Sequence, residues 1–314
     1  MIYIGIDIGG TGIQIGVVDE QGTILERGGI VTRTDLPVED QIREMAECAL
    51  DVLDRSGYTL DDLKAVGVGV PGVVDPRTNC IAFCNNMGWH QVPFQEIFRR
   101  YLDKPVYVDN DATVAGLAES VCGLSAGTNS SVFVTLGTGV GSGIVINGKV
   151  WSGAHGVGSE LGHVTLEVDG EPCTCGTSGC LEQYCSATAI IRMARRQVEG
   201  HPESLILTFS GGDPARITAK AVFDAAREGD TIALRVFRRF VHYLSMGLVS
   251  VIQFLDPEVI VLGGGVSKAG SFLLDAVREE VPRHLQYKDM DYSRIELAQL
   301  GADAGIIGAA MLGR

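Results

Sequence analysis

The sequence is short of positive charge. It has six lysines among 314 residues, and its 25 lysines and arginines face 39 acids, which gives a net charge of −14. Because nucleic-acid affinity rests mainly on phosphate contacts made by lysine and arginine, this balance argues against DNA or RNA as a partner. The densest basic stretches, 192–196 and 235–239, have helical spacing and are expected to form solvated helix faces.

No segment has the features of a membrane span or of a secretory leader. The longest uncharged apolar-rich run, Tyr243–Leu255, is shorter than the ~20 residues that a membrane helix needs. The segment after Met1 carries no basic residue, and an acid follows early at Asp7. We therefore expect a cytoplasmic protein without a membrane partner.

Proline is scarce, with ten residues, whereas glycine is abundant, with 41. The glycines follow no Gly-X-Y period, so a collagen-like or low-complexity chain is excluded. Four of the eight cysteines lie between Cys173 and Cys185. In a long chain without a leader, such clustering is more typical of a metal site than of a disulfide framework. At ~100–200 residues per domain, the length favours two domains.

The apolar pattern predicts an alternating α/β chain in which one unit occurs twice. The first half is predicted to contain strands at 2–8, 13–18, 23–32, 66–70 and 106–108, and helices at 38–56 and 112–121. The second half is predicted to contain strands at 131–136, 144–146 and 259–262, and helices at 186–198, 215–228, 230–254 and 270–286. In each half a strand runs through a glycine-rich turn into a second strand. This repetition predicts a duplicated two-domain α/β fold with a cleft between the halves.

Both glycine-rich turns are suited to presenting backbone N–H groups to a phosphate. The residues concerned are Asp7, Gly9, Gly10, Thr11 and Gly12 in the first turn and Gly137, Thr138 and Gly139 in the second. Neither turn is a Walker A loop or a dinucleotide fingerprint, because the P-loop lysine and the G-x-G-x-x-G spacing are both absent. Taken alone, each turn is also explained as a tight hairpin that needs positive φ. The carboxylate of Asp7 in the first turn suits two roles, which are to position Mg²⁺ or to cap the turn.

Four motifs occur in a fixed order along the chain. They are Asp-Ile-Gly-Gly-Thr (7–11), Leu-Gly-Thr-Gly-Val-Gly (136–141), Gly-Ser-Glu-Leu-Gly-His (158–163) and Cys-x-Cys-Gly-x-x-Gly-Cys-Leu-Glu (173–182). In these motifs the chain resembles the ROK family of sugar kinases, within the actin/hexokinase/Hsp70 superfamily, from end to end. The resemblance implies an actin-like ATPase (ribonuclease H-like) fold with a central cleft and a zinc-binding loop at 155–185. It implies a first domain at 1–118, on which a C-terminal helix at about 302–314 packs back, and a second domain at 119–301 that holds the nucleotide.

The resemblance also implies a sugar site. Its residues are Asn110, Asp111, Glu160, His163 and Glu182, with Gly72 and Asn86 as weaker candidates. A carboxylate is needed to accept the proton of the attacking hydroxyl, and the family pattern gives this role to Asp111. By spacing alone Asp109 competes for that role, and Asp111 also stands where a helix N-cap belongs.

His163, Cys173, Cys175 and Cys180 form a Cys₃His set that suits a closed, structural Zn²⁺ site. The alternative is a group of reduced, buried thiols beside a surface histidine. Cys185 is left outside the set. For the nucleotide base, the strand-to-helix turn with Gly264 and Gly265 allows a close backbone approach, although small residues there also suit simple packing.

The resemblance implies an ATP-dependent kinase that phosphorylates the 6-hydroxyl of a hexose, with D-glucose favoured, and that uses ATP with Mg²⁺. Other hexoses and N-acetylhexosamines (N-acetylglucosamine, N-acetylmannosamine, fructose, allose) are alternatives, and so is a non-catalytic sugar-sensing regulator. The chain departs from the family at Gly12, where lysine is frequent, so a lysine contribution to phosphate binding is absent. A homodimer or a higher even homo-oligomer is expected by resemblance.

Overall fold

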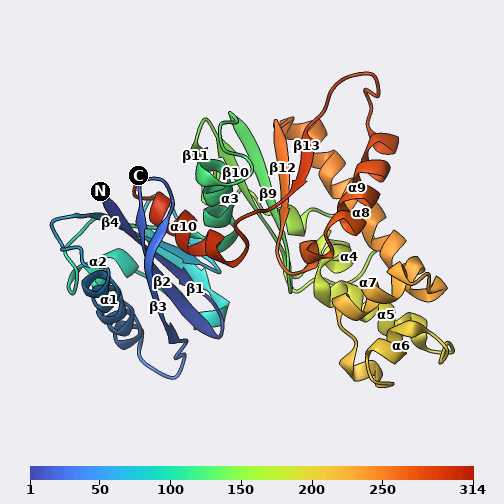
Figure 1. The fold of residues 1–314 in the computed structure, drawn as a ribbon, viewed down its shortest axis with the longest axis horizontal. Coiled ribbons are helices and arrows are strands. Elements are labelled where there is room, and N and C mark those ends of the chain that lie inside the picture. Colours follow the sequence, from blue (N-terminus) through green and yellow to red (C-terminus); the bar gives the residue numbers. More distant parts are fainter. The chain divides into compact units, whose positions relative to one another are not determined.

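The computed structural model describes residues 1–314 and divides them into two compact units. Unit 1 comprises Met1–Phe133, Gly143–Ser159 and Gln299–Arg314, and unit 2 comprises Val134–Ser142 and Glu160–Ala298. Figure 1 shows the helices and strands of both units. The C-terminal segment therefore belongs to the same unit as the N-terminus.

Unit 1 is built on a five-stranded sheet. Its strands are β1 (Ile2–Ile8), β2 (Gly12–Asp19), β3 (Ile24–Val31), β4 (Leu63–Val70) and β8 (Val106–Asn110), in the order β3-β2-β1-β4-β8. The first three strands are antiparallel, whereas β1, β4 and β8 run parallel. The strands predicted in this half are confirmed, because their apolar residues recur with the period of a strand.

Helices cover both faces of this sheet. In β1 the even-numbered isoleucines join a core with α1 (Val38–Arg55), whereas Tyr3 faces α3 (Asp111–Cys122) and α10 (Ala304–Met311). Alternate residues of a strand point to opposite faces, so β1 is buried on both sides. Figure 1 shows α1 and α10 on either side of the strands.

Helix α10 approaches the sheet more closely than side chains would allow. A Cβ on Gly5 would lie 1.9 Å from the carbonyl oxygen of Ile306, and one on Gly67 would lie 1.7 Å from that of Ala309. From the helix side, a Cβ on Gly308 would lie 1.7 Å from the carbonyl oxygen of Val114 in α3. Part of the glycine excess therefore serves backbone packing in the core of unit 1.

The sequence patterns missed a small antiparallel sheet in unit 1. It consists of β5 (Val73–Asp75), β6 (Cys80–Cys84) and β7 (Trp89–Val92), followed by α2 (Phe94–Arg99). These strands are three to five residues long, too short for a period to be recognised. Between β6 and β7 lies the 3₁₀ turn Asn85–Met87, which carries Asn86.

A second five-stranded sheet has the order β11-β10-β9-β12-β13. Its strands are β9 (Ser130–Leu136), β10 (Val140–Ile146), β11 (Lys149–Val150), β12 (Val259–Gly263) and β13 (Arg294–Leu297). Strands β11 and β13 were not predicted, and β10 begins four residues earlier than expected. The strand–glycine turn–strand unit thus occurs in both sheets, which confirms the predicted duplication.

Unit 2 contributes most of the helices. They are α4 (Glu182–Cys185), α5 (Ala187–Val198), α6 (Leu205–Phe209), α7 (Ala219–Arg227), α8 (Thr231–Leu255) and α9 (Ser271–His284). Helix α7 begins later than predicted, because the Thr218 hydroxyl caps it by accepting a hydrogen bond from the backbone N–H of Ala221. None of the helices is both long and apolar enough to cross a membrane.

Candidate functional site

Two carboxylates share the carboxyl edge of the sheet in unit 1. Asp7 is the last residue but one of β1 and pairs with Gly69 of β4, which in turn pairs with Asp109 of β8, two residues before Asp111. A Cβ on Gly69 would lie 3.8 Å from both the Oδ1 atom of Asp7 and the Cα atom of Asp111, so both acids lie beside this glycine. Burial, and then the charge of Asp111, raise the pKa of Asp7 to about 6. Such a pair of acids is suited to holding a cation.

Asn110, and not Asp111, is the N-cap of α3. Its Oδ1 atom accepts hydrogen bonds from the backbone N–H groups of Ala112 (2.9 Å) and Thr113 (3.2 Å), and its backbone is extended. The expectation of an N-cap at Asp111 is wrong by one residue, since a cap lies outside the helix and Asp111 is its first residue. The Asn110 Nδ2 atom donates to the carbonyl oxygen of Gly72 at 3.1 Å, which brings these two predicted residues together.

Asp109, the competing candidate for the base, is engaged by its own surroundings. Its Oδ1 atom accepts a hydrogen bond from the backbone N–H of Asn110 at 2.7 Å. Burial nevertheless raises its pKa. The carboxylate of Asp109 thus binds the backbone just before α3.

The first glycine-rich turn is closed by its own backbone. The N–H of Gly9 donates to the carbonyl oxygen of Gly12 at 3.0 Å, and the Thr32 hydroxyl donates to the carbonyl oxygen of Gly9 at 2.7 Å. None of the glycines of this turn has positive φ, so the explanation as a hairpin that needs positive φ is wrong. A Cβ on Gly9 would lie 2.8 Å from the Gly12 oxygen, and one on Gly10 would lie 3.8 Å from the Nδ2 atom of Asn86. The close approach of the Gly12 carbonyl oxygen explains why glycine stands at position 9. The side chain of Asn86 lies beside the turn at Gly10.

The second glycine-rich turn spans only 137–139, and the carboxylate of Glu182 anchors it. The N–H of Gly137 donates to the carbonyl oxygen of Gly139 at 2.9 Å. The Oε2 atom of Glu182 accepts from the N–H of Val140 at 2.9 Å, and a Cβ on Gly139 would lie 2.4 Å from that oxygen. Positive φ is absent here too. Glu182, predicted as a sugar contact, therefore holds the turn that is predicted to bind phosphate.

A cavity of about 580 Å³ in unit 2 opens beside this second turn. It is lined by Gly137, Thr138, Ala187, Ala219, Lys220, Phe223, Asp224, Arg227, Gly265, Val266, Lys268 and Ala269. Gly264 has a φ of 84°, and a Cβ there would lie 2.6 Å from the carbonyl oxygen of Leu136, so only glycine fits. Gly265 of the predicted strand-to-helix turn and two residues of the predicted phosphate turn, Gly137 and Thr138, thus line the same cavity.

Sequence patterns did not indicate the residues that α7 brings to this cavity. Phe223 offers an apolar ring, and Lys220 and Arg227 both pair with Asp224. Lys268 comes from the turn after β12. A lone phenylalanine or lysine on an amphipathic helix carries no signal in sequence, because the same residues occur on any helix of this kind.

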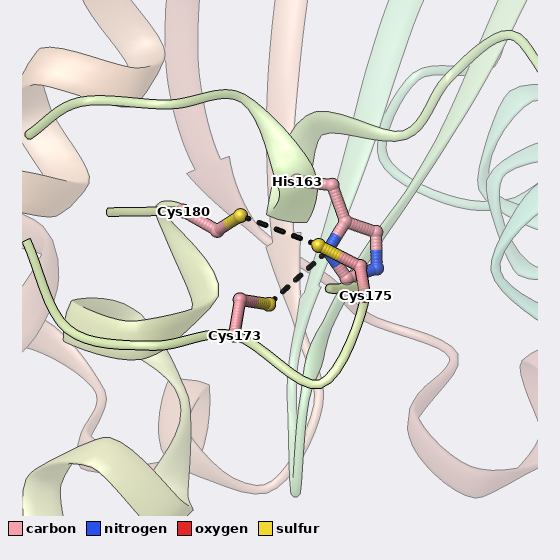
Figure 2. A group of neighbouring side chains, drawn as sticks. All are labelled: His163, Cys173, Cys175 and Cys180. Carbon is pink, nitrogen blue, oxygen red and sulfur yellow. Dashed lines mark hydrogen bonds between the residues drawn. The ribbon is translucent and has the colours of Figure 1, made fainter. Parts of the chain in front are cut away.

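The four predicted metal ligands lie together in unit 2. Each of the four residues offers one ligand atom, and these atoms all lie within 4.8 Å of one another. The residues are His163, Cys173, Cys175 and Cys180. The sulfur of Cys173 lies 3.7 Å from the Nδ1 atom of His163, and the sulfurs of Cys175 and Cys180 lie 3.6 Å apart (Figure 2). Ligands of a tetrahedral zinc with Zn–S bonds of ~2.3 Å lie about 3.8 Å apart, so these separations fit a Cys₃His zinc site.

The surroundings of this group shift the pKa values of two of its thiols in opposite directions and define its limit. Hydrogen bonds with Thr177 lower the pKa of Cys175, whereas burial raises that of Cys180. The thiol of Cys185 is fully buried and donates to the carbonyl oxygen of Phe240 (3.9 Å), outside the group. His163 ends a 3₁₀ turn whose N-cap is Glu160, an exposed residue. The metal group and the predicted sugar contact are thus neighbours along one short segment.

Each unit therefore gathers its own part of the predicted site. Unit 1 brings together the predicted residues Asp7, Gly9, Gly10, Thr11, Gly12, Gly72, Asn86, Asn110 and Asp111. Unit 2 holds Gly137, Thr138, Gly139, Glu160, His163, Cys173, Cys175, Cys180, Glu182, Gly264 and Gly265. The described chain offers an acid pair, two glycine turns, a cavity and a thiol–imidazole group.

Similar proteins carry the same fold over their full length. A glucokinase of Thermotoga maritima is 38% identical over 310 residues, which cover 98% of this chain and 96% of that protein. A crystal structure of a ROK family glucokinase from Streptomyces griseus, in complex with glucose and AMPPNP, matches with 35% identity and a TM-score of 0.83, over 99% of both chains. A ROK hexokinase from Thermus thermophilus matches with 33% identity and a TM-score of 0.85, over 99% of this chain and 97% of that chain.

A sequence model of the ROK family matches residues 3–314 of the chain. The match includes both glycine turns, the acid pair and the thiol–imidazole group described above. The chain belongs to the ROK family.

Proposed function

We propose that the protein is an ATP-dependent glucokinase, which transfers the γ-phosphoryl group of ATP to the 6-hydroxyl of D-glucose. The observation that carries the proposal is the pair of carboxylates, Asp7 and Asp111, at the carboxyl edge of the sheet in unit 1. A phosphoryl transfer to a hydroxyl needs a base for the proton and a cation for the phosphates. The glucokinase relatives, at 35–38% identity over almost the whole chain, support glucose as the acceptor.

Asp111 is the base in this proposal. It accepts the proton of the sugar hydroxyl as the oxygen attacks the γ-phosphorus, and the neighbouring N-terminus of α3 favours its ionised form. The Nδ2 atom of Asn110 has a second N–H beyond the one donated to Gly72, and this N–H is available to a sugar oxygen. The same residue that caps the helix thus orients the acceptor.

The phosphates are held mainly by backbone and hydroxyl groups. The N–H groups of the two glycine turns, with the hydroxyls of Thr11 and Thr138, supply donors without adding positive charge. Asp7 would hold Mg²⁺, directly or through water, and the chemistry that a bound cation would supply is positive charge beside the phosphates. The cavity beside Gly265 takes the adenosine, with the Phe223 ring against the base.

A Zn²⁺ ion would be held by Cys173, Cys175, Cys180 and His163, and its role would be structural. Four protein ligands leave no coordination position for substrate or water. Through the segment that they fix, these ligands position Glu160 and His163. With Nδ1 directed at the thiols, the Nε2 atom of His163 remains for a sugar hydroxyl.

The experiment that tests the proposal is ADP release by the purified protein with ATP and Mg²⁺, measured against a panel of sugars. The panel contains glucose, fructose, allose, mannose, N-acetylglucosamine and N-acetylmannosamine. The highest kcat/KM is expected with glucose. A clear preference for another sugar would reassign the substrate within the kinases, and no ADP release with any sugar would favour a sugar-sensing regulator.

The assembly and the compartment are part of the proposal. We expect a homodimer or a higher even homo-oligomer in the cytoplasm, where ATP and reduced thiols are available. Sedimentation of the purified protein measures the assembly.

A further inference from the structure

Arginines gather around a second cavity of unit 2, of about 470 Å³. Arg192 and Arg196 come from α5, Arg235 and Arg239 from α8, and Glu171 is the one acid that lines it. Four guanidinium groups face one carboxylate here, in a chain whose net charge is −14. Arg196, Arg235 and Arg239 are exposed, as expected for solvated helix faces, and the packing of α5 on α8 brings them to one cavity.

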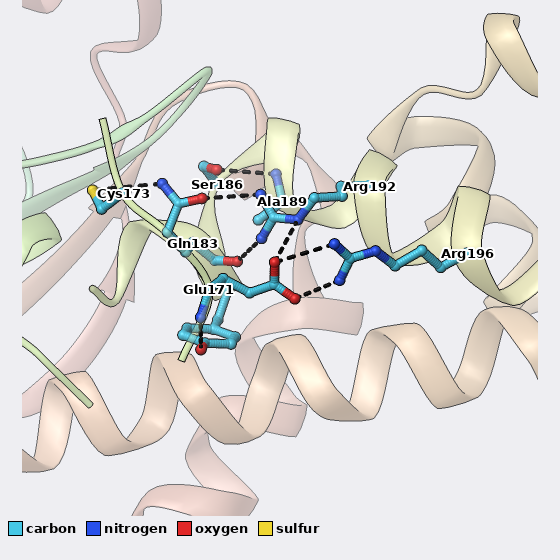
Figure 3. A network of polar contacts seen from close by, with 8 residues as sticks. Glu171, Cys173, Gln183, Ser186, Ala189, Arg192 and Arg196 are labelled. Carbon is cyan, nitrogen blue, oxygen red and sulfur yellow. Dashed lines mark hydrogen bonds and ion pairs between the residues drawn. The ribbon is translucent and has the colours of Figure 1, made fainter. Parts of the chain in front are cut away.

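The single carboxylate of this cavity is already used by two of the arginines. Arg196 binds both oxygens of Glu171, and the Nε atom of Arg192 lies 3.8 Å from one of them (Figure 3). The carboxylate is thus paired with Arg192 and Arg196, and it forms no ion pair with Arg235 or Arg239.

Two arginines of α8 have no carboxylate partner. Arg235 donates to the neutral side chain of Gln197 at 2.9 Å. The guanidinium of Arg239 lies over the rings of Tyr184 and Tyr243, 5.9 and 5.4 Å from their centres. Stacking of this kind leaves the edge of the guanidinium, with its N–H donors, directed away from the rings.

Contacts within the protein fix the guanidinium of Arg192. Its Nε atom is buried and faces Glu171 at ion-pair distance, without a hydrogen bond. The other nitrogens of this side chain donate to Gln183, whose own Nε2 atom donates to the sulfur of Cys173 at 3.6 Å. These bonds hold the Arg192 guanidinium in place at the wall of the cavity.

Carboxylates of an adjoining hollow do not pair with the arginines of the cavity. That hollow shares Arg239 with the cavity and is lined also by Glu167 and Asp169. Glu167 accepts a hydrogen bond from the hydroxyl of Tyr243 at 2.7 Å. Neither acid lines the cavity itself or forms an ion pair with its arginines.

We propose that this cavity binds a small anion that carries a phosphate group. Guanidinium groups bind phosphate oxygens in pairs of parallel hydrogen bonds, and the three oxygens of a phosphate monoester reach several arginines at once. The cavity volume of about 470 Å³ fits a small molecule and not a polymer. The arginines that lack a carboxylate partner, Arg235 and Arg239, supply the charge that binds it.

Calorimetric titration of the full-length protein tests this site. Inorganic phosphate and glucose 6-phosphate serve as separate probes, in the presence of saturating glucose and Mg²⁺–AMPPNP so that substrate sites elsewhere are filled. Tighter binding of the sugar phosphate would identify a phosphate ester as the ligand, whereas equal binding would identify free phosphate as sufficient. Both results require saturable binding of a phosphate group.

The double variant Arg235→Gln, Arg239→Gln is expected to weaken this binding at least tenfold. Neither residue forms an ion pair, so the variant leaves no carboxylate without its partner. Arg238→Gln is the matched control, because Arg238 lies on the same helix but lines a different hollow with Glu279 and Glu280. Its affinity should stay within twofold of the parent protein.

Four results would overturn the proposal. Three concern binding: no saturable binding in the parent protein, equal loss in the double variant and in the control, and binding that persists unchanged in the double variant. The fourth is a lower sedimentation coefficient of the double variant without any phosphate effect, since the arginines would then contact a second copy of the chain.

Discussion

The buried carboxylate of Asp7 makes a testable contribution to the pH dependence of stability. Its pKa in the folded protein is about 6, against an ordinary value of 3.8, with burial as the larger cause and Asp111 as the smaller. The perturbation is Asp7→Asn, which removes the ionisable group and keeps a side chain of nearly the same size. When no cation is bound, ionisation of the buried Asp7 carboxylate should lower the stability of the folded protein.

The sign follows from which state binds the proton more tightly. Because the folded-state pKa is the higher one, the folded protein binds the proton more tightly, and stability falls as pH rises from about 3.8 to about 6 and then levels off. Once Asp7 is ionised, its pKa difference lowers the free energy of unfolding by about 3 kcal/mol. About 1.4 kcal/mol of this loss occurs between pH 5 and pH 8. The variant lacks this component, so its advantage over the parent protein should grow by that amount across the interval.

Urea unfolding without Mg²⁺ or nucleotide, at several pH values from 5 to 8, measures the effect. Both tryptophans of the chain, Trp89 and Trp151, lie in unit 1, so tryptophan fluorescence reports the unfolding of the unit that contains Asp7. Asp61→Asn, at an exposed acid, is the control and should follow the parent protein at every pH. Parallel curves for Asp7→Asn and the parent protein would refute the reasoning.

Three further predictions concern the acceptor base, the metal group and the core. Asp111→Asn should lower kcat by about 10²–10⁴-fold while the KM for glucose changes little, and a kcat near the parent value would remove Asp111 as the base. Cys175→Ser should lower the zinc content from one ion per chain and raise the sugar KM, as metal analysis and kinetics would measure; zinc-free parent protein contradicts the site. Gly308→Ala should destabilise unit 1 by about 1–3 kcal/mol in urea, because its Cβ would lie 1.7 Å from a carbonyl oxygen. At Gly265 a Cβ meets no atom within 4 Å, so Gly265→Ala should leave stability unchanged, and equal losses in both variants would contradict the packing argument.

Long elements were predictable because their residues repeat with a clear period. The buried isoleucines of β1 and the apolar face of α1 each recur often enough to define a strand or a helix. The strands β5 and β13 were missed, since three or four residues define no period and their pairing depends on distant strands. The N-cap was misplaced by one residue because Asn110 and Asp111 are both good caps, and only the backbone angles select one of them.

The candidate site divides in a similar way. Motif residues were found in sequence, because glycine turns and a Cys₃His set are local patterns with defined spacing. The residues of the cavity beside Gly265, such as Phe223 and Lys268, come from segments far apart in the chain and have no local signature. Histidines show the same limit, since the approach of His242 and His284 to a shared carboxylate, Glu280, requires α8 to lie beside α9.

The sequence by itself determined the chemistry that the chain carries: the acids, the glycine turns, the thiols and the family to which they belong. Tertiary structure alone decided what those residues touch. It showed that glycines without positive φ are needed for close approach, that Glu182 anchors a glycine turn, and that arginines of α5 and α8 share one cavity. The physical reason is that residue type and spacing fix local conformation, whereas burial, pKa and contact depend on segments that only folding brings together.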